Sequence, residues 1–389
     1  MIINPKPPQL KLPWQCLQIG LLLLPLLPTW GCLVTLFGVF LTWKYRLKAI
    51  IQNPINQGLG VVSLLLLITV IFAQDPLNAL LGTGNFIPYF IVFAAFSELI
   101  QTPQQLRRLS WIFMLPVIPI IILGFGQQFL GWSGGEAIQG FLGWTLQLNG
   151  NPPGRMASVF MYANILAAYL LLVFTLAAGL WIEQLQIALK AKFNTKLKSL
   201  IVLGLILILT GTALIVTYSR NAWGLVVVIT LAYSIYCGWR WLVGLIVSGI
   251  IAILGAAFAP FPINQGLRLI VPAYVWQRLT DQNFERPIET LRITQWQFAW
   301  NLTQQRPWMG WGFRSFTTLY EEKMQVWMGH PHNLFLMLTA EIGIPVTILF
   351  VGIIGWILTE FIHGLTSISI ENSDRLILFS YGLAFGIYI

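Results

Sequence analysis

Two histidines stand close together in the stretch His330-Pro331-His332-Asn333, directly before the apolar run that starts at Leu334. That run predicts a helix, and the N-terminus of a helix disfavours a positively charged imidazolium. A histidine held neutral in this way can act as a general base near neutral pH. We therefore take His332 as the candidate base and keep His330 as the alternative. The competing structural interpretation is a histidine that only caps the helix.

An arginine occupies a very short turn between two apolar segments, in Thr217-Tyr218-Ser219-Arg220. A charge flanked by membrane on both sides is costly unless it is paired or faces a polar cavity. Arg220 is therefore a candidate functional residue. The alternative is that its side chain reaches outward to the lipid headgroups.

A second arginine lies on a surface helix that we predict between Pro287 and Arg306. Arg292 precedes Trp296 by four residues and Trp300 follows one turn later, so the cation and both indoles share one side of the helix. Tryptophans commonly form a belt at the membrane interface, which is the structural interpretation of the two indoles. Arg292 is the stronger functional candidate, because an exposed ion pair with Glu289 would be worth little.

A glycine pair, Gly310 and Gly312, follows this helix within the segment 307–313, whose sequence is Pro-Trp-Met-Gly-Trp-Gly-Phe. Glycines allow close backbone approach and unusual dihedral angles. The segment is not a phosphate-binding P-loop, because no Gly-Lys-Ser/Thr sequence follows it.

The elements that must position these residues are membrane helices. Apolar residues make up 57% of the 389 residues and charged residues 9%, with a mean hydropathy of +0.76, whereas about 25% of the residues of a soluble domain are charged. Because a spanning helix needs about 20 largely apolar residues, we predict an all-α membrane protein with about eleven transmembrane helices. They are expected near 16–29, 31–44, 56–73, 86–101, 108–129, 157–181, 199–217, 221–237, 241–259, 333–360 and 375–389.

The N-terminal apolar run has no small-residue cleavage site, so we predict that it is retained as the first helix. Only Pro28 and Thr29 separate the first two predicted helices, and a single broken helix is the alternative there. The charge pattern supports two helices. With the N-terminus in the cytoplasm, thirteen of the 22 basic residues fall in short inner segments, as the positive-inside rule requires. Those inner residues include Lys6, Lys192 and Lys196.

This orientation predicts three regions. Residues 1–259 form an N-terminal bundle of about nine helices, residues 260–331 form a large extracytoplasmic loop, and residues 332–389 form the C-terminal helices. A connection of that length is uncommon unless it is functional. The chain ends at Ile389 inside an apolar segment.

The outer basic residues are almost all arginines: Arg155, Arg220, Arg268, Arg278, Arg286, Arg292, Arg306, Arg314 and the single lysine Lys323. Arginine binds phosphate through a planar fork, whereas lysine is a point charge. The outer face therefore favours a phosphorylated ligand, with simple surface solvation as the alternative. The outer loop has no Asp-x-Asp pair or histidine-carboxylate cluster to hold Mg²⁺. The three cysteines lack a C-x-x-C spacing.

The order of these motifs resembles that of the O-antigen ligase and polymerase family of bacterial membrane glycosyltransferases. The resemblance rests on four features over about 155–360: Ser219-Arg220, Arg292, the Pro-x-x-Gly-x-Gly segment 307–312, and His332-Asn333-Leu334. Each motif is loose by itself. Their shared order and predicted outer side make the match more specific.

The resemblance implies a fold of the lipid-dependent, GT-C-like glycosyltransferase kind in the bacterial inner membrane, with the active loop on the periplasmic side. It implies transfer of a glycan from an undecaprenyl-diphosphate-linked donor to the hydroxyl of a glycan or lipid acceptor, without metal, cofactor or nucleic acid. His332 would deprotonate the acceptor, and Arg220 and Arg292 would hold the diphosphate and stabilise its leaving charge. The predicted substrate-binding residues are Arg220, Arg292, Arg314, Trp296, Asn333, Gly310 and Gly312.

Three alternatives stay open at this stage. A polymerase of the same family would use the same donor chemistry with another acceptor. A transporter for inorganic carbon or a small solute should show ionisable groups near the middle of the membrane, and Glu341 is the one that lies well inside a predicted span. A non-catalytic relative that binds polyprenyl lipids would keep the arginines and need no base.

Overall fold

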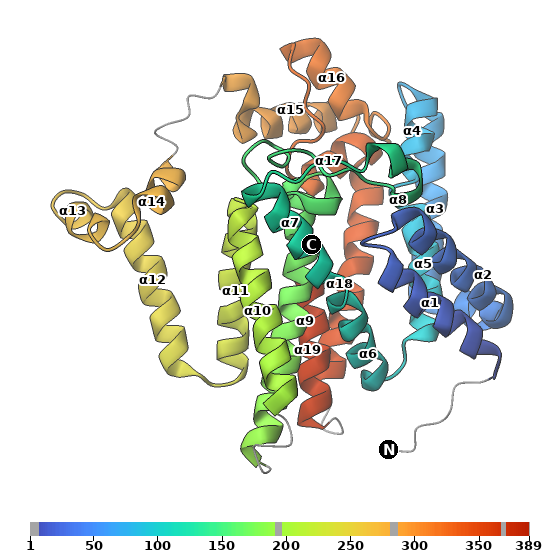
Figure 1. Cartoon of the computed structure of the whole chain (residues 1–389). Helices are drawn as coiled ribbons and strands as arrows, with labels where there is room; N and C mark the ends of the chain where they lie inside the picture. Colours follow the sequence, from blue (N-terminus) through green and yellow to red (C-terminus); the bar gives the residue numbers. More distant parts are fainter. Residues whose placement is uncertain (1–7, 191–196, 281–286, 367–370, 389) are drawn as a thin grey trace. The chain divides into compact units, whose positions relative to one another are not determined.

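The structure is a computed structural model that describes residues 8–190, 197–280, 287–366 and 371–388. Four basic residues of the charge pattern (Lys6, Lys192, Lys196 and Arg286) and the chain end at Ile389 lie outside the described residues. Within them the chain is helical, and its two isolated β-bridges do not extend into strands. The all-α prediction is confirmed for this part of the chain (Figure 1).

The chain divides into two compact units. The first unit contains Met1–Arg46, Phe96–Ile246 and His363–Ile389, and the second contains Leu47–Ala95 and Val247–Ile362. Each unit has buried hydrophobic clusters of its own.

The first unit is built around the long helix α9 (Ala163–Lys190), which packs against its neighbours in sequence and against the C-terminal helix (Figure 1). Buried alanines on α9 and Gly179 let these neighbours approach closely. The other helices of the unit are α1 (Lys11–Leu23), the first part of α2 (Pro28–Gln52, kinked at Arg46), α6 (Pro103–Met114), α7 (Val117–Phe129), α10 (Leu197–Val216), α11 (Arg220–Tyr236) and α19 (Asn372–Gly386), with the short η1 (Pro8–Leu10), η2 (Glu136–Ile138), α8 (Gln139–Leu142) and η3 (Ser158–Phe160) between them.

One ionic cluster joins three helices of the first unit. Arg107 on α6 donates from Nε to Glu183 on α9 at 2.8 Å, and from a terminal nitrogen to Asp374 on α19 at 2.7 Å. The carboxylate of Glu183 is largely buried, and its charge is compensated by the guanidinium. Removing one member of such a cluster leaves a buried charge without compensation.

The second unit holds the described part of segment 260–331, which was predicted as the outer loop, together with the helices that pack against it. Its first part contains α3 (Pro54–Ile71), α4 (Pro76–Thr83) and the start of α5 (Ile87–Leu99). Its second part contains the end of α12 (Arg240–Phe258), then α13 (Ile263–Arg268), α14 (Ala273–Thr280), η5 (Ile288–Thr290), α15 (Arg292–Gln305), α16 (Ser315–Met324), α17 (Leu334–Ile342) and most of α18 (Ile344–Thr366).

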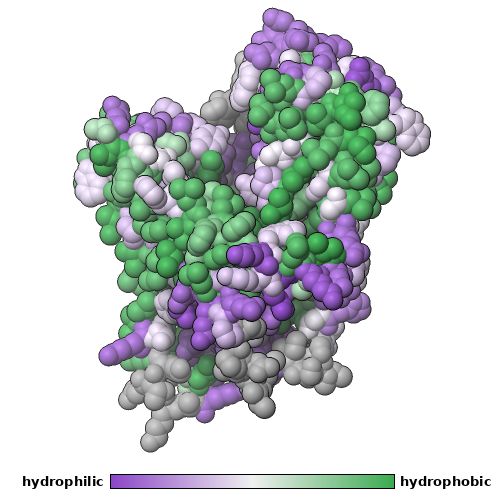
Figure 2. Space-filling model, turned by 90° about the vertical axis from the view of Figure 1, so that its right-hand side faces the viewer, coloured by the Kyte–Doolittle hydropathy of each residue, from purple (hydrophilic) through white to green (hydrophobic). Residues whose placement is uncertain are grey.

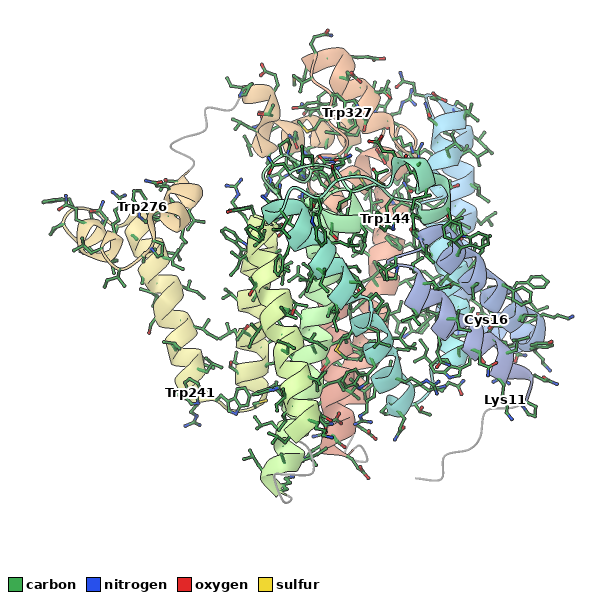
Figure 3. All side chains as sticks on the ribbon, in the orientation of Figure 1. Lys11, Cys16, Trp144, Trp241, Trp276 and Trp327 are labelled. Atoms are coloured by element: carbon green, nitrogen blue, oxygen red, sulfur yellow. The ribbon has the colours of Figure 1, made fainter. Side chains whose placement is uncertain are left out.

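Two clusters fix the arrangement of the second unit. Leu59, Val62 and Leu66 of α3 pack with residues of α17 and α18, while Phe298 of α15 packs edge-on against Tyr320 of α16. Arg268, the last residue of α13, donates to the carbonyl of Ala256 in α12 at 2.8 Å, and its guanidinium lies over the ring of Trp276, which Figure 3 labels. Helices α15 and α16 are therefore held by buried hydrophobic contacts with each other and with α17.

Seven stretches of the described chain, rather than eleven, are helical, long and apolar enough to cross a membrane. They are Pro54–Ile71, Pro76–Leu99, Pro103–Phe129, Ala163–Lys190, Leu197–Val216, Arg240–Phe258 and Ile344–Thr366. Helices α1, α11 and α19 have 13, 17 and 15 residues and are therefore short for a span. Broad hydrophobic areas also cover the face that Figure 2 shows.

Two predicted helices have different bounds in the structure. The helix expected near 333–360 divides at Gly343, whose positive φ of 83° interrupts the α-helical backbone and leaves α17 separate from α18. Glu341 consequently lies in α17, outside the seven candidate spans. The predicted surface helix between Pro287 and Arg306 is confirmed from Arg292 to Gln305 and is preceded by a short 3₁₀ turn.

Candidate functional site

The histidine segment forms the entry to α17 in the second unit. Asn333 caps the helix, because its Oδ1 accepts a hydrogen bond from the Leu336 N–H at 3.1 Å. His332, one residue earlier, has a left-handed backbone with φ of 53°. Its ring meets the ring of His330 edge to face, with centroids 4.4 Å apart. The helix cap is thus supplied by Asn333, and both imidazoles remain accessible.

The surroundings of His332 favour its neutral form. Partial burial lowers the pKa of His332 below its ordinary value of 6.5, and the neighbouring charges of His330 and Arg292 lower it further. The imidazole is therefore neutral, and able to accept a proton, at neutral pH.

Helix α15 brings Arg292 and Trp296 to the same place. Arg292 is its first residue, and the indole N–H of Trp296 donates to the carbonyl of Pro331 at 2.9 Å. Further along, Thr303 of α15 and Thr339 of α17 share a buried hydrogen bond of 3.1 Å. Four residues predicted from the sequence, Arg292, Trp296, His332 and Asn333, therefore gather where α15 meets the start of α17.

The glycine pair has a clear structural role at the other end of α17. Gly310 and Gly312 have positive φ values of 66° and 98°. A Cβ on Gly310 would lie 2.4 Å from the Glu341 carbonyl, and one on Gly312 would lie 2.4 Å from the Ala73 Cβ. The N–H groups of Trp311 and Gly312 donate to the carbonyls of Ala340 and Glu341 at 2.9 and 2.8 Å. Close packing accounts for the two glycines, and substrate contact by them stays a prediction.

Arg314 follows the glycines and begins α16 from a left-handed conformation, with φ of 65°. Beneath it, the carboxylate of Glu341 accepts hydrogen bonds from the N–H groups of Arg314 and Phe316. Burial raises the pKa of Glu341 to about 7, although these hydrogen bonds and the Arg314 charge oppose the rise. Hydropathy predicts Glu341 inside a span, so its hydrogen bonds to the start of α16 could not be foreseen from the sequence.

Arg220 lies in the first unit, as the first residue of α11. Tyr218, in the turn before it, has a left-handed backbone with φ of 50°. Arg155 holds this turn, since it donates to the Thr217 carbonyl at 2.8 Å and to Asn164 Oδ1 at 2.7 Å. In the sequence Arg155 is recognisable only as a predicted outer charge, because the residue that it contacts lies 62 residues away along the chain.

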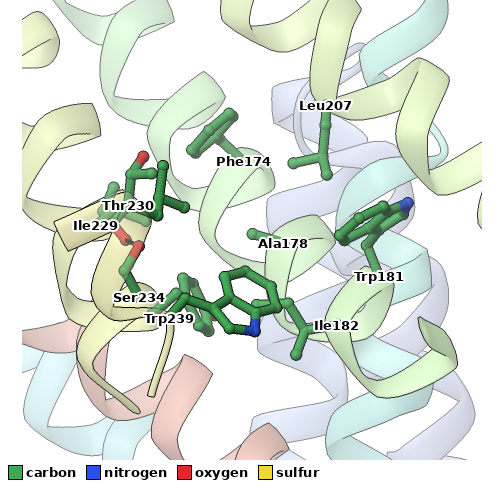
Figure 4. Close-up of a pocket in the computed structure, with 11 residues that line it drawn as sticks. Phe174, Ala178, Trp181, Ile182, Leu207, Ile229, Thr230, Ser234 and Trp239 are labelled. Carbon is green, nitrogen blue, oxygen red and sulfur yellow. Dashed lines mark hydrogen bonds between the residues drawn. The ribbon is translucent and has the colours of Figure 1, made fainter. Parts of the chain in front are cut away.

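A small apolar pocket of about 170 Å³ lies elsewhere in the first unit, between α9, α10, α11 and the residues that follow α11. Figure 4 shows Phe174, Trp181 and Trp239 around it. Among the described residues, no three His, Cys, Asp or Glu side chains are arranged to hold a metal ion.

Comparison with known families adds to this geometry. Residues 205–351 match the Wzy_C family model, described as O-antigen ligase. This part of the chain is similar to the O-antigen ligase family. The resemblance expected from the sequence is therefore confirmed over these residues. No curated protein matched the chain in a search for relatives.

The matched region 205–351 contains all the predicted catalytic and substrate-binding residues, from Arg220 in the first unit to Asn333 in the second. The family indicates membrane glycan ligation or polymerisation, and the apolar helices indicate a multi-pass membrane protein. The polar candidates Arg292, His332 and Asn333 lie outside the seven candidate spans.

Proposed function

We propose that this protein transfers a glycan from an undecaprenyl-diphosphate-linked donor to a hydroxyl of a glycan or lipid acceptor. The reaction takes place on the periplasmic side of a bacterial inner membrane, at the outer loop 260–331, without metal or cofactor. The observation that carries the proposal is the position of His332 at the start of α17, beside His330 and Arg292 and within the matched region, where burial and these neighbours lower the pKa of its imidazole.

In the proposed step His332 takes the proton of the acceptor hydroxyl as the acceptor oxygen bonds to the anomeric carbon of the donor sugar. The bond between that carbon and the diphosphate oxygen breaks, and undecaprenyl diphosphate leaves with the electron pair. A neutral imidazole suits this role, because it accepts the proton without first having to lose one.

The leaving diphosphate develops negative charge that must be stabilised. We assign this work to Arg220 and Arg292, because guanidinium groups bind phosphate oxygens through two parallel hydrogen bonds. Arg314 stays a substrate-binding candidate. Trp296 and Asn333 hold the residues around His332 in place: the indole N–H of Trp296 donates a hydrogen bond to the Pro331 carbonyl, and the side-chain amide of Asn333 caps α17.

Ligation is the leading form of the reaction, and polymerisation by the same donor chemistry is its closest alternative. A transporter is less well supported, because Glu341 lies outside the candidate spans and serves instead as an acceptor for backbone N–H groups of α16.

The test is transfer in detergent with EDTA present, from a purified undecaprenyl-diphosphate glycan to candidate acceptors. His332→Ala and Arg292→Ala should each reduce the rate by about 10²-fold or more, and Arg220→Ala should behave similarly. His363→Ala, in the last turn of α18, is the matched histidine control and should leave the rate unchanged. Parental turnover by a properly folded His332→Ala protein would refute the assignment of the base, and a rate that requires added Mg²⁺ would refute metal independence.

A further inference from the structure

A polar cleft of about 370 Å³ lies in the second unit, between the N-terminal ends of α4 and α16. Its volume is within the usual range of small-molecule sites. Its polar lining comes from both helices and the residues just before them: Gln74, Asp75, Asn78, Arg314, Ser315, Thr318 and Glu322.

The walls of the cleft are held in place by backbone and side-chain contacts. Asp75 caps α4 by accepting hydrogen bonds from the N–H and the side-chain amide of Asn78, at 3.1 and 2.6 Å. The Gln74 N–H donates to the carbonyl of Trp311 at 3.0 Å. Phe313, on the floor, stacks on Phe86 with a centroid distance of 5.1 Å. The cleft is thus formed before any ligand binds.

The chemistry of the lining fits a sugar better than an anion or a lipid tail. Two carboxylates, Asp75 and Glu322, stand with the amides of Gln74 and Asn78 and the donor-only Arg314. Sugar hydroxyls both donate and accept, so such a mixed set can satisfy neighbouring hydroxyl groups. A phosphate would meet two like charges here, whose repulsion disfavours binding.

One residue that lines the cleft also carries a polar atom without a hydrogen-bond partner among the described residues. The Oγ of Ser315 is buried and makes no hydrogen bond with the described residues. A neighbouring cavity of about 320 Å³, lined by Phe72, Arg306, Trp308 and Met309 among others, has no carboxylate in its lining. The combination of acceptors and donors therefore distinguishes the Asp75–Glu322 cleft from this neighbour.

We propose that the Asp75–Glu322 cleft is a saccharide subsite, which holds a sugar unit of the transferred or accepting glycan away from the reacting bond. At 1.5 Å per residue, the stretch of α17 from Asn333 to Glu341 spans about 12 Å. The side chain of Glu341 accepts a hydrogen bond from the Phe316 N–H, at the start of α16 beside the cleft, and Asn333 directly follows His332 in the chain. The cleft thus lies about one length of α17 from the proposed base, which is a reach suited to an oligosaccharide.

That the bound sugar belongs to the transferred or accepting glycan rests on the proposed function. The effect of the cleft on the rate follows from a general property of enzymes. Binding energy from remote parts of a substrate can be used to orient its reacting end. A cleft that holds the next sugars along the chain would therefore raise the rate with long glycans more than with short ones. Changes in the cleft should raise KM for the glycan without abolishing turnover.

The experiment is saturation-transfer NMR on the full chain in detergent. The probe is the oligosaccharide released by mild acid from the lipid-linked glycans of the source cells. Glu322→Gln and Asp75→Asn should each weaken binding about tenfold, as loss of a hydrogen bond to a charged group implies. Asparagine also caps helices well, so Asp75→Asn keeps the start of α4. Thr318→Trp, which fills the cleft, should abolish binding.

Glu321→Gln is the matched control, because Glu321 is exposed on the same helix and does not line the cleft. It should bind the oligosaccharide within twofold of the parent. Equal binding by the parent and a folded Thr318→Trp protein would overturn the proposal, as would equal effects of Glu321→Gln and Glu322→Gln or no binding by the parent at millimolar probe.

Binding and turnover separate this subsite from the proposed reaction. His332→Ala should lose transfer and keep oligosaccharide binding. If the parent binds the probe through the cleft but transfers nothing from any lipid-linked donor, the reaction is wrong and the saccharide subsite stands. If transfer occurs and cleft variants bind and react like the parent, the subsite is wrong and the reaction stands.

Discussion

Replacing Gly310 by alanine should destabilise the protein well beyond an ordinary glycine substitution. The new Cβ would lie 2.4 Å from both the carbon and the oxygen of the Glu341 carbonyl, so backbone on both sides must separate. The separation breaks the hydrogen bonds from Trp311 to Ala340 and from Gly312 to Glu341.

The magnitude follows from these contacts. A left-handed backbone costs a non-glycine residue about 1–2 kcal/mol, and two lost hydrogen bonds cost about 1 kcal/mol each. The free energy of unfolding should therefore fall by about 3–4 kcal/mol. Gly154→Ala is the matched control: its φ is +82° and nothing lies within 4 Å of its Cβ position, so it should cost only about 1–2 kcal/mol.

The assay is unfolding of both variants and the parent in the same detergent, followed by intrinsic tryptophan fluorescence. The Gly310→Ala protein should unfold at a clearly lower temperature than the Gly154→Ala protein. Equal losses in the two variants would refute the reasoning, because they would show that the packing of segment 307–313 against α17 contributes nothing measurable.

Three further outcomes are expected. The pKa of Glu341 is raised from 4.5 to about 7 in the folded chain, so the folded state binds more protons than the unfolded state between these pH values. Stability should therefore fall as pH rises through this window. In thermal unfolding at several pH values, the unfolding temperature of Glu341→Gln should depend less on pH than that of the parent. Arg107→Met should cost about 3–5 kcal/mol in unfolding free energy because it leaves two buried carboxylates unpaired, whereas the exposed Arg108→Met should change it by about 0.5 kcal/mol at most. The transfer rate should decline only in acid, below the ordinary histidine pKa of 6.5. Arg292→Gln should move that decline to higher pH in a pH–rate profile, because it removes a charge that lowers the pKa of His332. An unmoved profile would contradict the electrostatic coupling of Arg292 and His332.

The sequence predicted what depends on composition and helical spacing. Hydropathy gave the all-helical membrane character, and apolar spacing gave the helix that carries Arg292 and Trp296. The start of α17 was predictable too, because His332 and Asn333 immediately precede an apolar run. These features are local, and local patterns are what a single sequence displays.

The break in the predicted 333–360 helix was missed because hydropathy stays high across it. Gly343 followed by Pro345 was the available signal, since glycine is common just beyond a helix end and proline is common in the first turn of the next. The partnership of Arg107 with Glu183 and Asp374 left no such signal. Its members lie 76 and 267 residues apart, so tertiary packing alone brings them together.

The contacts of segment 307–313 determine how the predicted outer loop could be replaced by the corresponding loop of a similar protein. Trp311 is bonded through its backbone to both Gln74 and Ala340, and Phe313 occupies the space that a Cβ on Gly82 would need. A chimera that replaces residues 260–331 alone would pack a foreign loop against Gln74, Gly82 and Ala340, whose contacts are made by the native loop. The natural module for transplantation includes residues 72–82 and 340–343 as well, and a chimera with all three segments should fold where the loop alone fails.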